Sequence, residues 1–188
     1  LSENGRIQYT GDDGKLVYGQ GIDISKHNGT VDWEKVKASG VRFAFIRVGI
    51  RGYGSGKIVE DENFSDNADQ AAKAGLKVGV YFFTQAVNED EAKEEADFVI
   101  GCIKDKKITY PVVYDVEEID NYDTEPRTLN LTQDQYTKNA VTFCEEIKNA
   151  GYEPMIYGNI KTFMKLLDLK QLENYDKEWS TPSSLNFA

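Results

Sequence analysis

The chain of 188 residues carries 22 Lys and Arg against 32 Asp and Glu, which gives a net charge of −10 at pH 7. This balance argues against a nucleic-acid-binding protein and against adhesion to anionic membranes, because the sequence has no basic cluster for phosphate groups. Hydrophobic residues make up 40% of the chain and aromatic residues 12%, enough to fill the core of one domain.

Other features of the sequence argue against a membrane-spanning protein and against a metal centre. No apolar run approaches the ~20 residues that span a bilayer. His27 is the only histidine, so a His-rich metal centre is excluded and neither metal nor cofactor is expected. Cys102 and Cys144 lie in different predicted helices, and free thiols are favoured over a disulfide, which stays open. The chain starts at Leu1 without a signal peptide, which suggests a processed product or an excised fragment.

The predicted elements follow one rhythm along the chain. Residues 1–18 are polar and predict a linker or arm, and residues 19–188 predict one domain. Short runs rich in β-branched and aromatic residues predict strands at 20–24, 41–48, 76–83, 110–117 and 152–158. Helical patterns lie between them, near 32–39, 62–74, 88–104, 132–150 and 160–169.

Glycine marks the joints between three of these helices and the strands that follow. "SGV", "AGL" and "AGY" stand at 39–41, 74–76 and 150–152, where a glycine that adopts positive φ commonly ends a helix. Repeated helix–glycine–strand joints, with strands that are apolar on both faces, indicate parallel strands connected by crossover helices.

Two parallel architectures compete, an open doubly wound sheet and a (β/α) barrel. The segment "GIDISKHNG" after the first strand lacks the glycines of a dinucleotide-binding loop. Polar and aromatic side chains instead recur where predicted strands end: Asp23, Arg47, Tyr81, Phe83, Gln85, Asp115, Glu117 and Tyr157. A barrel gathers such strand ends on one face, where active sites are built, so the barrel is favoured.

The segment "YPVVYDVEEID" ends a buried run with two acids, Asp115 and Glu117. Residues two apart on a strand point to the same side, roughly 6.5–7 Å apart, and mutual repulsion should raise the proton affinity of one of them. A protonated acid beside an ionised carboxylate suits glycoside hydrolysis. Asp23 should reach the same end of the barrel, although a capping role is equally compatible with it. For Glu118 and Asp120, a loop role at the rim is favoured.

Four segments extend this interpretation: "GIDISKHNGTVDWEKVKASGVRFAFIRVGIRGYG", "AGLKVGVYFFTQA", "YPVVYDVE" and "AGYEPMIYG". In this order, from Gly19 to Trp179, they resemble the glycoside hydrolase family 25 lysozymes. The resemblance implies an irregular, TIM-like (β/α) barrel with fewer helices than strands. It also implies hydrolysis of the β-1,4 bond between N-acetylmuramic acid and N-acetylglucosamine in bacterial peptidoglycan, and hence an extracellular or cell-wall location.

The resemblance also implies roles for residues. Glu117 takes the general acid position, Asp115 the supporting carboxylate, and Asp23 the remaining acidic position of the family. Asp115 is expected to hold the substrate N-acetyl group while its carbonyl oxygen attacks the anomeric carbon. Direct, inverting attack by water stays open as an alternative.

Other residues are expected to line the groove or to serve the fold. The aromatic groove positions fall on Tyr81, Phe83 and Tyr157, although barrel interiors also hold aromatic residues. Arg47 and Arg51 lie near the predicted groove. For both, a salt bridge to an acid there is favoured over direct substrate contact.

The sequence departs from the family pattern at two places. Val116 stands where the family has an aromatic residue between the two acids, which predicts altered packing with unchanged chemistry. The ending "STPSSLNFA" shows no strand pattern and no late acid, so the barrel is expected to be incomplete at its C-terminal strands. The alternatives are a non-catalytic peptidoglycan-binding or cell-wall module, or another carbohydrate hydrolase. We expect a monomer unless a partner chain covers the open edge.

Overall fold

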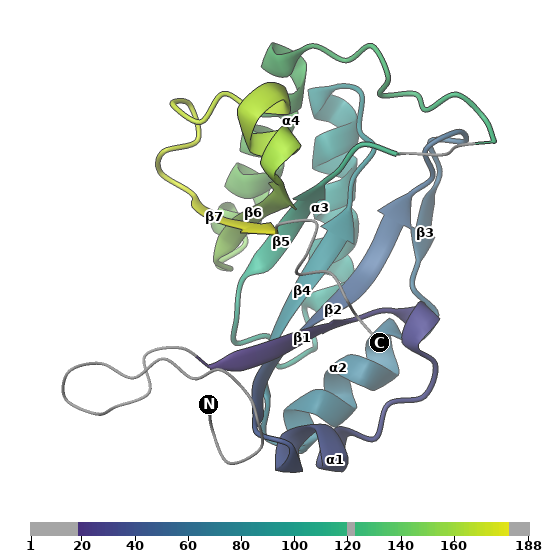
Figure 1. The fold of residues 1–188 in the computed structure, drawn as a ribbon, viewed down its shortest axis with the longest axis vertical. Coiled ribbons are helices and arrows are strands. Elements are labelled where there is room, and N and C mark those ends of the chain that lie inside the picture. Colours follow the sequence, from purple (N-terminus) through teal and green to yellow (C-terminus); the bar gives the residue numbers. More distant parts are fainter. Residues whose placement is uncertain (1–18, 120–122, 181–188) are drawn as a thin grey trace.

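Parallel strands follow one another across the sheet in the order of the chain. The computed structural model describes residues 19–119 and 123–180. Within them, the parallel strands are β1 (Gln20–Ile24), β2 (Val41–Arg51), β4 (Lys77–Phe83), β5 (Val112–Val116), β6 (Pro154–Asn159) and β7 (Asp176–Ser180). The sheet order is β1-β2-β4-β5-β6-β7, and the short β3 (Ile58–Glu60) pairs with β2 in antiparallel direction (Figure 1).

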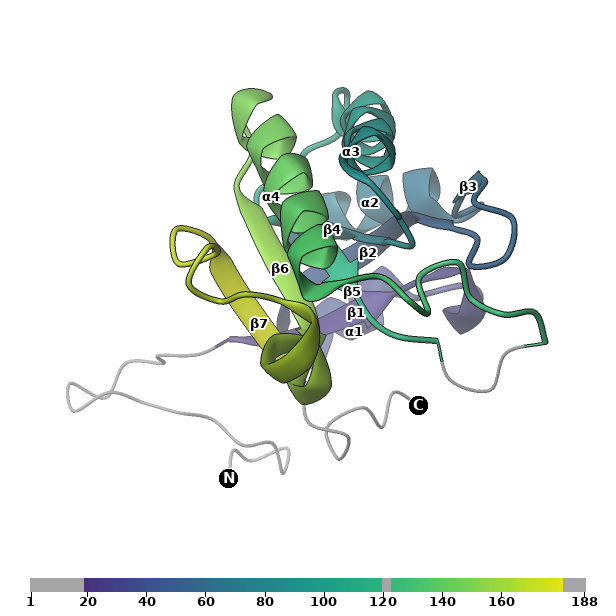
Figure 2. The same cartoon turned by 90° about the horizontal axis from the view of Figure 1, so that it is seen from above.

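This order decides between the two architectures. A doubly wound sheet reverses its strand order at a switch point, whereas each parallel strand here lies beside its predecessor, as in a barrel. Seen from above, the sheet curls without closing, and in the described part of the chain β1 and β7 do not pair (Figure 2). The prediction of an incomplete, TIM-like barrel of parallel strands is therefore confirmed.

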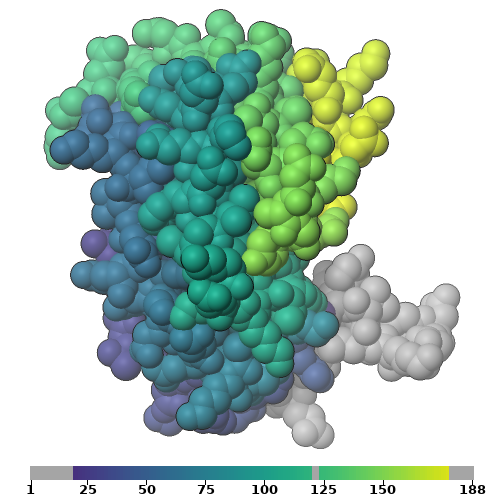
Figure 3. Space-filling model, turned by 180° about the vertical axis from the view of Figure 1, so that it is seen from behind, coloured from purple at the N-terminus to yellow at the C-terminus, as the bar shows by residue number. Residues whose placement is uncertain are grey.

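The helices cover the outside of this curved sheet. The α-helices are α1 (Trp33–Ala38), α2 (Phe64–Lys73), α3 (Glu89–Ile103) and α4 (Gln133–Asn149). A 3-10 helix, η1 (Lys26–Asn28), follows β1, and a π-helix, η2 (Thr162–Leu166), follows β6. Figure 3 shows α3 and α4 packed side by side on the outer face of the molecule. We call the sheet face under α2, α3 and α4 the outer face and the opposite one the inner face.

Alternating side chains of the strands separate the core from the inner face. Ala44, Ile46 and Val48 of β2 are fully buried on the outer face, as are the corresponding residues of β4 and β5. Tyr114 of β5 packs on Phe143 of α4, with ring centroids 4.5 Å apart. The alternate positions point to the inner face and are mostly half-buried, among them Phe43, Phe45, Arg47, Tyr81, Phe83, Met155 and Tyr157.

Most predicted elements are confirmed with small shifts of their ends. Gly40, Gly75 and Gly151, at the three helix–strand joints, have φ of 95°, 79° and 88°. The β2 strand runs on to Arg51, and β3 and β7 were not predicted. None of the described helices has the length and apolar character needed to cross a membrane. The linker predicted for residues 1–18 lies outside the described residues.

The helix predicted near 160–169 is present but shorter and irregular. Residues 160–166 are helical, the last five as the π-helix η2, and Leu167 is already extended. Thr162 turns its hydroxyl away to donate to the carbonyl of Val116, at 2.9 Å, and its backbone N–H donates to the side chain of Asn159. These contacts with β5 and the end of β6 tie the segment to the sheet instead of letting a regular helix extend.

Candidate active site

Three carboxyl groups meet at the carboxyl ends of the strands, on the inner face. Asp23 on β1 is paired with Phe45, and Asp115 on β5 is paired with Phe83 on one side and Tyr157 on the other. Neighbours in register on a parallel sheet point to the same side, so these residues share one face. Glu117 follows directly after β5, two residues beyond Asp115.

The environment of Asp115 favours its protonated form. The side chain is buried, with the residue 7% exposed, and its Oδ1 has no hydrogen-bond partner. Burial raises the pKa of Asp115 well above its ordinary value, and the negative charges of Glu117 and Asp23 raise it further, while Arg47 opposes them. The arrangement therefore gathers acids without giving each a counter-charge, as catalytic sites commonly do.

The two other acids respond in the same direction. Burial raises the pKa of Glu117. Burial also raises the pKa of Asp23, against the effect of a backbone hydrogen bond. Carboxyl groups that keep a proton at higher pH than in water can act as general acids, so the site is chemically suited to protonate a leaving oxygen.

Arg47 lies on the same face and forms the predicted salt bridge. Its Nε and Nη2 lie 2.9 and 2.8 Å from Oδ2 of Asp61. Asp61 is buried and also accepts the backbone N–H groups of Lys26 and Asn63, at 3.0 and 3.1 Å. Asp61 thus fixes Arg47 at the edge of the acid cluster, where the arginine charge still acts on Asp115.

The predicted aromatic positions flank the acids. Tyr81 is paired with Arg47, and burial raises the pKa of its hydroxyl, with the charges of Asp23 and Asp115 contributing in the same direction. Phe83 and Tyr157 lie on either side of Asp115 by register. All three rings are half-buried on the inner face. The structure therefore brings the predicted site residues to one face of the sheet.

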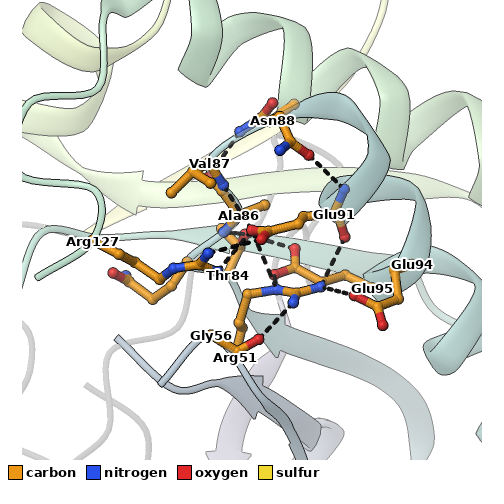
Figure 4. Close-up of polar contacts among 12 residues, drawn as sticks. Arg51, Gly56, Thr84, Ala86, Val87, Asn88, Glu91, Glu94, Glu95 and Arg127 are labelled. Carbon is orange, nitrogen blue, oxygen red and sulfur yellow. Dashed lines mark hydrogen bonds and ion pairs between the residues drawn. The ribbon is translucent and has the colours of Figure 1, made fainter. Parts of the chain in front are cut away.

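Arg51 departs from the expectation that it lies near the groove. A register shift between Arg47 and Gly49 changes which residues of β2 point outward, so Arg51 faces α3. There its Nε lies 2.7 Å from Oε1 of the fully buried Glu95, and its Nη2 lies 2.7 Å from Glu94 (Figure 4). Arg51 is thus part of an ionic network between the sheet and α3.

Several side chains serve the fold. Trp33 is buried in the core, and its Nε1 donates to Asn67 at 3.3 Å. His27 is exposed on η1. Glu118 forms an ion pair with Lys161, in line with a role at the rim. Asp120 lies outside the described residues.

Two further predictions concern the cysteines and a metal centre. Cys102 and Cys144 are free, the first half-buried and the second buried, which confirms the preference for thiols. Among residues 19–119 and 123–180, no group of three or more His, Cys, Asp or Glu side chains could hold a metal ion.

Comparison with known proteins places the chain in a family. The model of "Glycosyl hydrolases family 25" matches residues 22–181. The autolytic lysozyme of Clostridium acetobutylicum is 29% identical over 138 residues, which cover 73% of this chain and 37% of that protein. Lysozyme M1 of Streptomyces globisporus is 33% identical over 102 residues, or 52% of this chain and 32% of that protein.

Solved structures agree on the fold. The autolysin LytC of Streptococcus pneumoniae, solved with a synthetic peptidoglycan ligand, matches with a TM-score of 0.70 and 26% identity over 88% of this chain and 39% of that one. A family 25 glycosyl hydrolase from Bacillus anthracis matches with a TM-score of 0.67 and 21% identity, over 94% and 75%. The chain therefore spans well under half of the two curated lysozymes and of LytC, and it belongs to glycosyl hydrolase family 25.

Proposed function

We propose that residues 19–188 form a muramidase domain that hydrolyses the β-1,4 bond between N-acetylmuramic acid and N-acetylglucosamine in bacterial peptidoglycan. The observation that carries the proposal is the buried Asp115, whose Oδ1 has no partner, next to Glu117 on the inner face of a family 25 barrel. The names of the curated relatives, both lysozymes, and the peptidoglycan ligand of LytC support the substrate class.

In this proposal Glu117 is the general acid. Burial raises its pKa, so a larger fraction of the side chain carries a proton near neutral pH than in free glutamic acid. The proton moves to the glycosidic oxygen as the bond from that oxygen to the anomeric carbon breaks.

Asp115 supports the nucleophile. The N–H of the substrate N-acetyl group donates to the unpartnered Oδ1 of Asp115, which turns the acetyl carbonyl oxygen toward the anomeric carbon. The acetyl oxygen bonds to the anomeric carbon as the leaving oxygen departs, which gives a cyclic intermediate. Water then attacks the anomeric carbon, breaks its bond to the acetyl oxygen, and gives a proton to Glu117. Asp23 adds negative charge beside the positive charge that develops on the sugar. Inverting attack by water is distinguished by NMR of the first product anomer.

The rest of the inner face holds the glycan. Tyr81, Phe83 and Tyr157 provide aromatic surface beside the acids, and Arg47, fixed by Asp61, provides a positive charge. Peptidoglycan lies outside the cell membrane, so the domain acts as a secreted or cell-wall-associated bacteriolytic enzyme. It acts as a monomer unless a partner chain covers the open edge of the sheet. The proposal needs no cofactor, and residues 1–18 are its linker.

The experiment compares wild-type protein with Glu117→Gln by the loss of turbidity of a peptidoglycan suspension. Removing the general acid should lower the rate by about 10²–10⁴-fold. Glu118→Gln is the matched control, because the neighbouring Glu118 pairs with Lys161, and its rate should stay close to wild type. Equal rates for wild type and Glu117→Gln contradict the role of Glu117. Wild-type protein that binds the suspension without clearing it supports the non-catalytic module instead.

A further inference from the structure

Gln85 is a buried polar residue that the proposed mechanism does not use. It lies just after β4 and is 2% exposed. The backbone pairing of β4 with β5 ends at Phe83 and Asp115, followed by one more hydrogen bond from the N–H of Thr84 to the carbonyl of Asp115, at 3.1 Å. Nε2 of Gln85 then donates to the carbonyl of Glu117, at 3.3 Å. The side chain thus continues the ladder past the end of the backbone pairing.

The other end of the Gln85 amide is held as well. Its Oε1 accepts a hydrogen bond of 3.0 Å from the hydroxyl of Thr128, a buried residue of the segment between β5 and α4. If the amide flipped, its NH₂ would face the hydroxyl and its oxygen would face the carbonyl of Glu117, which cannot donate. Nε2 is therefore directed toward Glu117.

The backbone around Gln85 is fixed by its neighbours. The hydroxyl of Thr84 donates to Glu95 at 2.7 Å and accepts the N–H of Ala86 at 3.1 Å. The carbonyl of Ala86 accepts a hydrogen bond of 2.8 Å from Asn139 on α4. Figure 4 shows Thr84 and Ala86 next to the ionic network of α3. The segment that carries Gln85 is thus attached to both α3 and α4.

Thr128 is held through the residue before it. Arg127 forms a bidentate ion pair with Glu91 of α3, at 2.7 and 2.8 Å (Figure 4). Its backbone N–H donates to the carbonyl of Tyr53, at 3.0 Å. Bidentate pairs of this kind restrict geometry strongly. Gln85 therefore connects the backbone of Glu117 to a firmly attached segment.

We propose that Gln85 is a positioning residue that sets the location of the Glu117 carboxyl group. The inference rests on the proposed role of Glu117 as general acid. Glu117 lies beyond the last residue of β5, so the sheet alone does not fix its backbone. Displacements of about 1 Å at a catalytic group can lower a rate by roughly 10²-fold, so this one hydrogen bond matters for the proton transfer.

The test uses Gln85→Met, which keeps the length of the side chain and removes both hydrogen bonds. With soluble peptidoglycan glycan chains as substrate, kcat should fall by about ten- to hundredfold while KM changes by less than about twofold. A purely structural role would leave kcat near wild type in the folded protein. Thr137→Val on α4 is the control, since it removes the hydrogen bonds that the buried Thr137 forms with Gln133 and Asp168 and should leave kcat unchanged.

A second pair of variants tests the same contact from the other side. Thr128→Val removes the hydrogen bond to Oε1 and should lower kcat less than Gln85→Met does, whereas Thr128→Ser should restore it. A kcat within twofold of wild type for both Gln85→Met and Thr128→Val, with Glu117→Gln inactive, overturns the inference and leaves the proposed function in place. A fully active Glu117→Gln overturns both.

Discussion

Two buried carboxylates, Glu95 and Asp115, lie on opposite faces of the same sheet and have opposite surroundings. Glu95 is fully buried, and its oxygens are bound by Nε of Arg51 and the hydroxyl of Thr84, both at 2.7 Å. Asp115 is 7% exposed, its Oδ1 has no partner, and its charged neighbours include Glu117 and Asp23. The first carboxylate holds α3 against the sheet, and the second has an unpartnered acceptor, to which the proposed mechanism assigns the substrate N-acetyl group.

The comparison shows that burial alone does not separate a structural acid from a functional one. The pKa of Glu95 is raised to about 7, because burial outweighs the hydrogen bonds from Thr84 and Arg51, which lower it. At Asp115, burial and the two neighbouring acids all act in the same direction, with Arg47 opposing. Buried polar groups normally find partners, so the unpartnered oxygen of Asp115 agrees with the substrate-holding role proposed for it.

Arg51→Met removes the counter-charge of Glu95 and should have the largest effect on stability. Glu95 would be left buried without its counter-charge, so the free energy of unfolding should fall by about 3–5 kcal/mol at neutral pH. Urea denaturation measures it. The double variant with Glu95→Gln should recover part of the loss, and a loss below about 1 kcal/mol contradicts the structural role.

The pH dependence of the stability lost in Arg51→Met tests whether Glu95 is the group responsible. A carboxyl group whose folded pKa is raised contributes stability that is present below its unfolded pKa and lost as pH rises through the folded pKa. The variant should therefore lose least near pH 4 and more as pH rises toward and above 7. A loss that is independent of pH would mean that Glu95 is not the group left uncompensated.

Gly79→Ala tests how tightly the inner face is packed beneath the acids. A Cβ at Gly79 would lie 2.4 Å from the ring of Phe45 and 2.9 Å from the carbonyl of Pro111, so we expect a loss of about 1–3 kcal/mol. Gly101→Ala on α3 is the control, because its Cβ would meet nothing within 4 Å and the helix should gain slightly. Equal stability of the two variants in urea denaturation would show that the face is loosely packed.

Asp115→Asn tests the carboxyl group that has an unpartnered oxygen. It should have the smallest effect on stability and should stabilise the protein. The raised pKa of Asp115 means that its contribution to stability is lost as pH rises, whereas asparagine does not titrate. At pH 7 the midpoint of thermal unfolding should rise by about 2–4 °C while the hydrolytic rate falls, and near pH 3 the gain should vanish. A lower midpoint at pH 7 would contradict the account.

Local patterns predict most of the fold and the acid pair. The glycines at 40, 75 and 151 mark the helix ends, and the spacing of Asp115 and Glu117 predicts two neighbouring acids, in agreement with the effect of the Glu117 charge on Asp115. Both signals depend on short-range geometry, which a sequence shows directly.

The remaining features depend on contacts between distant segments. The register shift in β2 turns Arg51 outward, and no residue type announces it. Asp61, which fixes Arg47, follows the three-residue β3, too short for a strand pattern. The partner of Gln85, Thr128, lies 43 residues further along the chain. The last strand, β7, reads Asp-Lys-Glu-Trp-Ser, where charged residues hide the alternation of a strand.

The central claim is that the acid cluster on the inner face hydrolyses the β-1,4 bond between N-acetylmuramic acid and N-acetylglucosamine, which leaves N-acetylmuramic acid at the new reducing end. The direct measurement is to digest purified peptidoglycan, reduce the new ends with borohydride and identify the reduced sugar by mass spectrometry. The account predicts reduced N-acetylmuramic acid with wild-type protein and at least about a hundredfold less of it in the same time with Glu117→Gln. Reduced N-acetylglucosamine as the only new end, or equal amounts of product from both proteins, would contradict it.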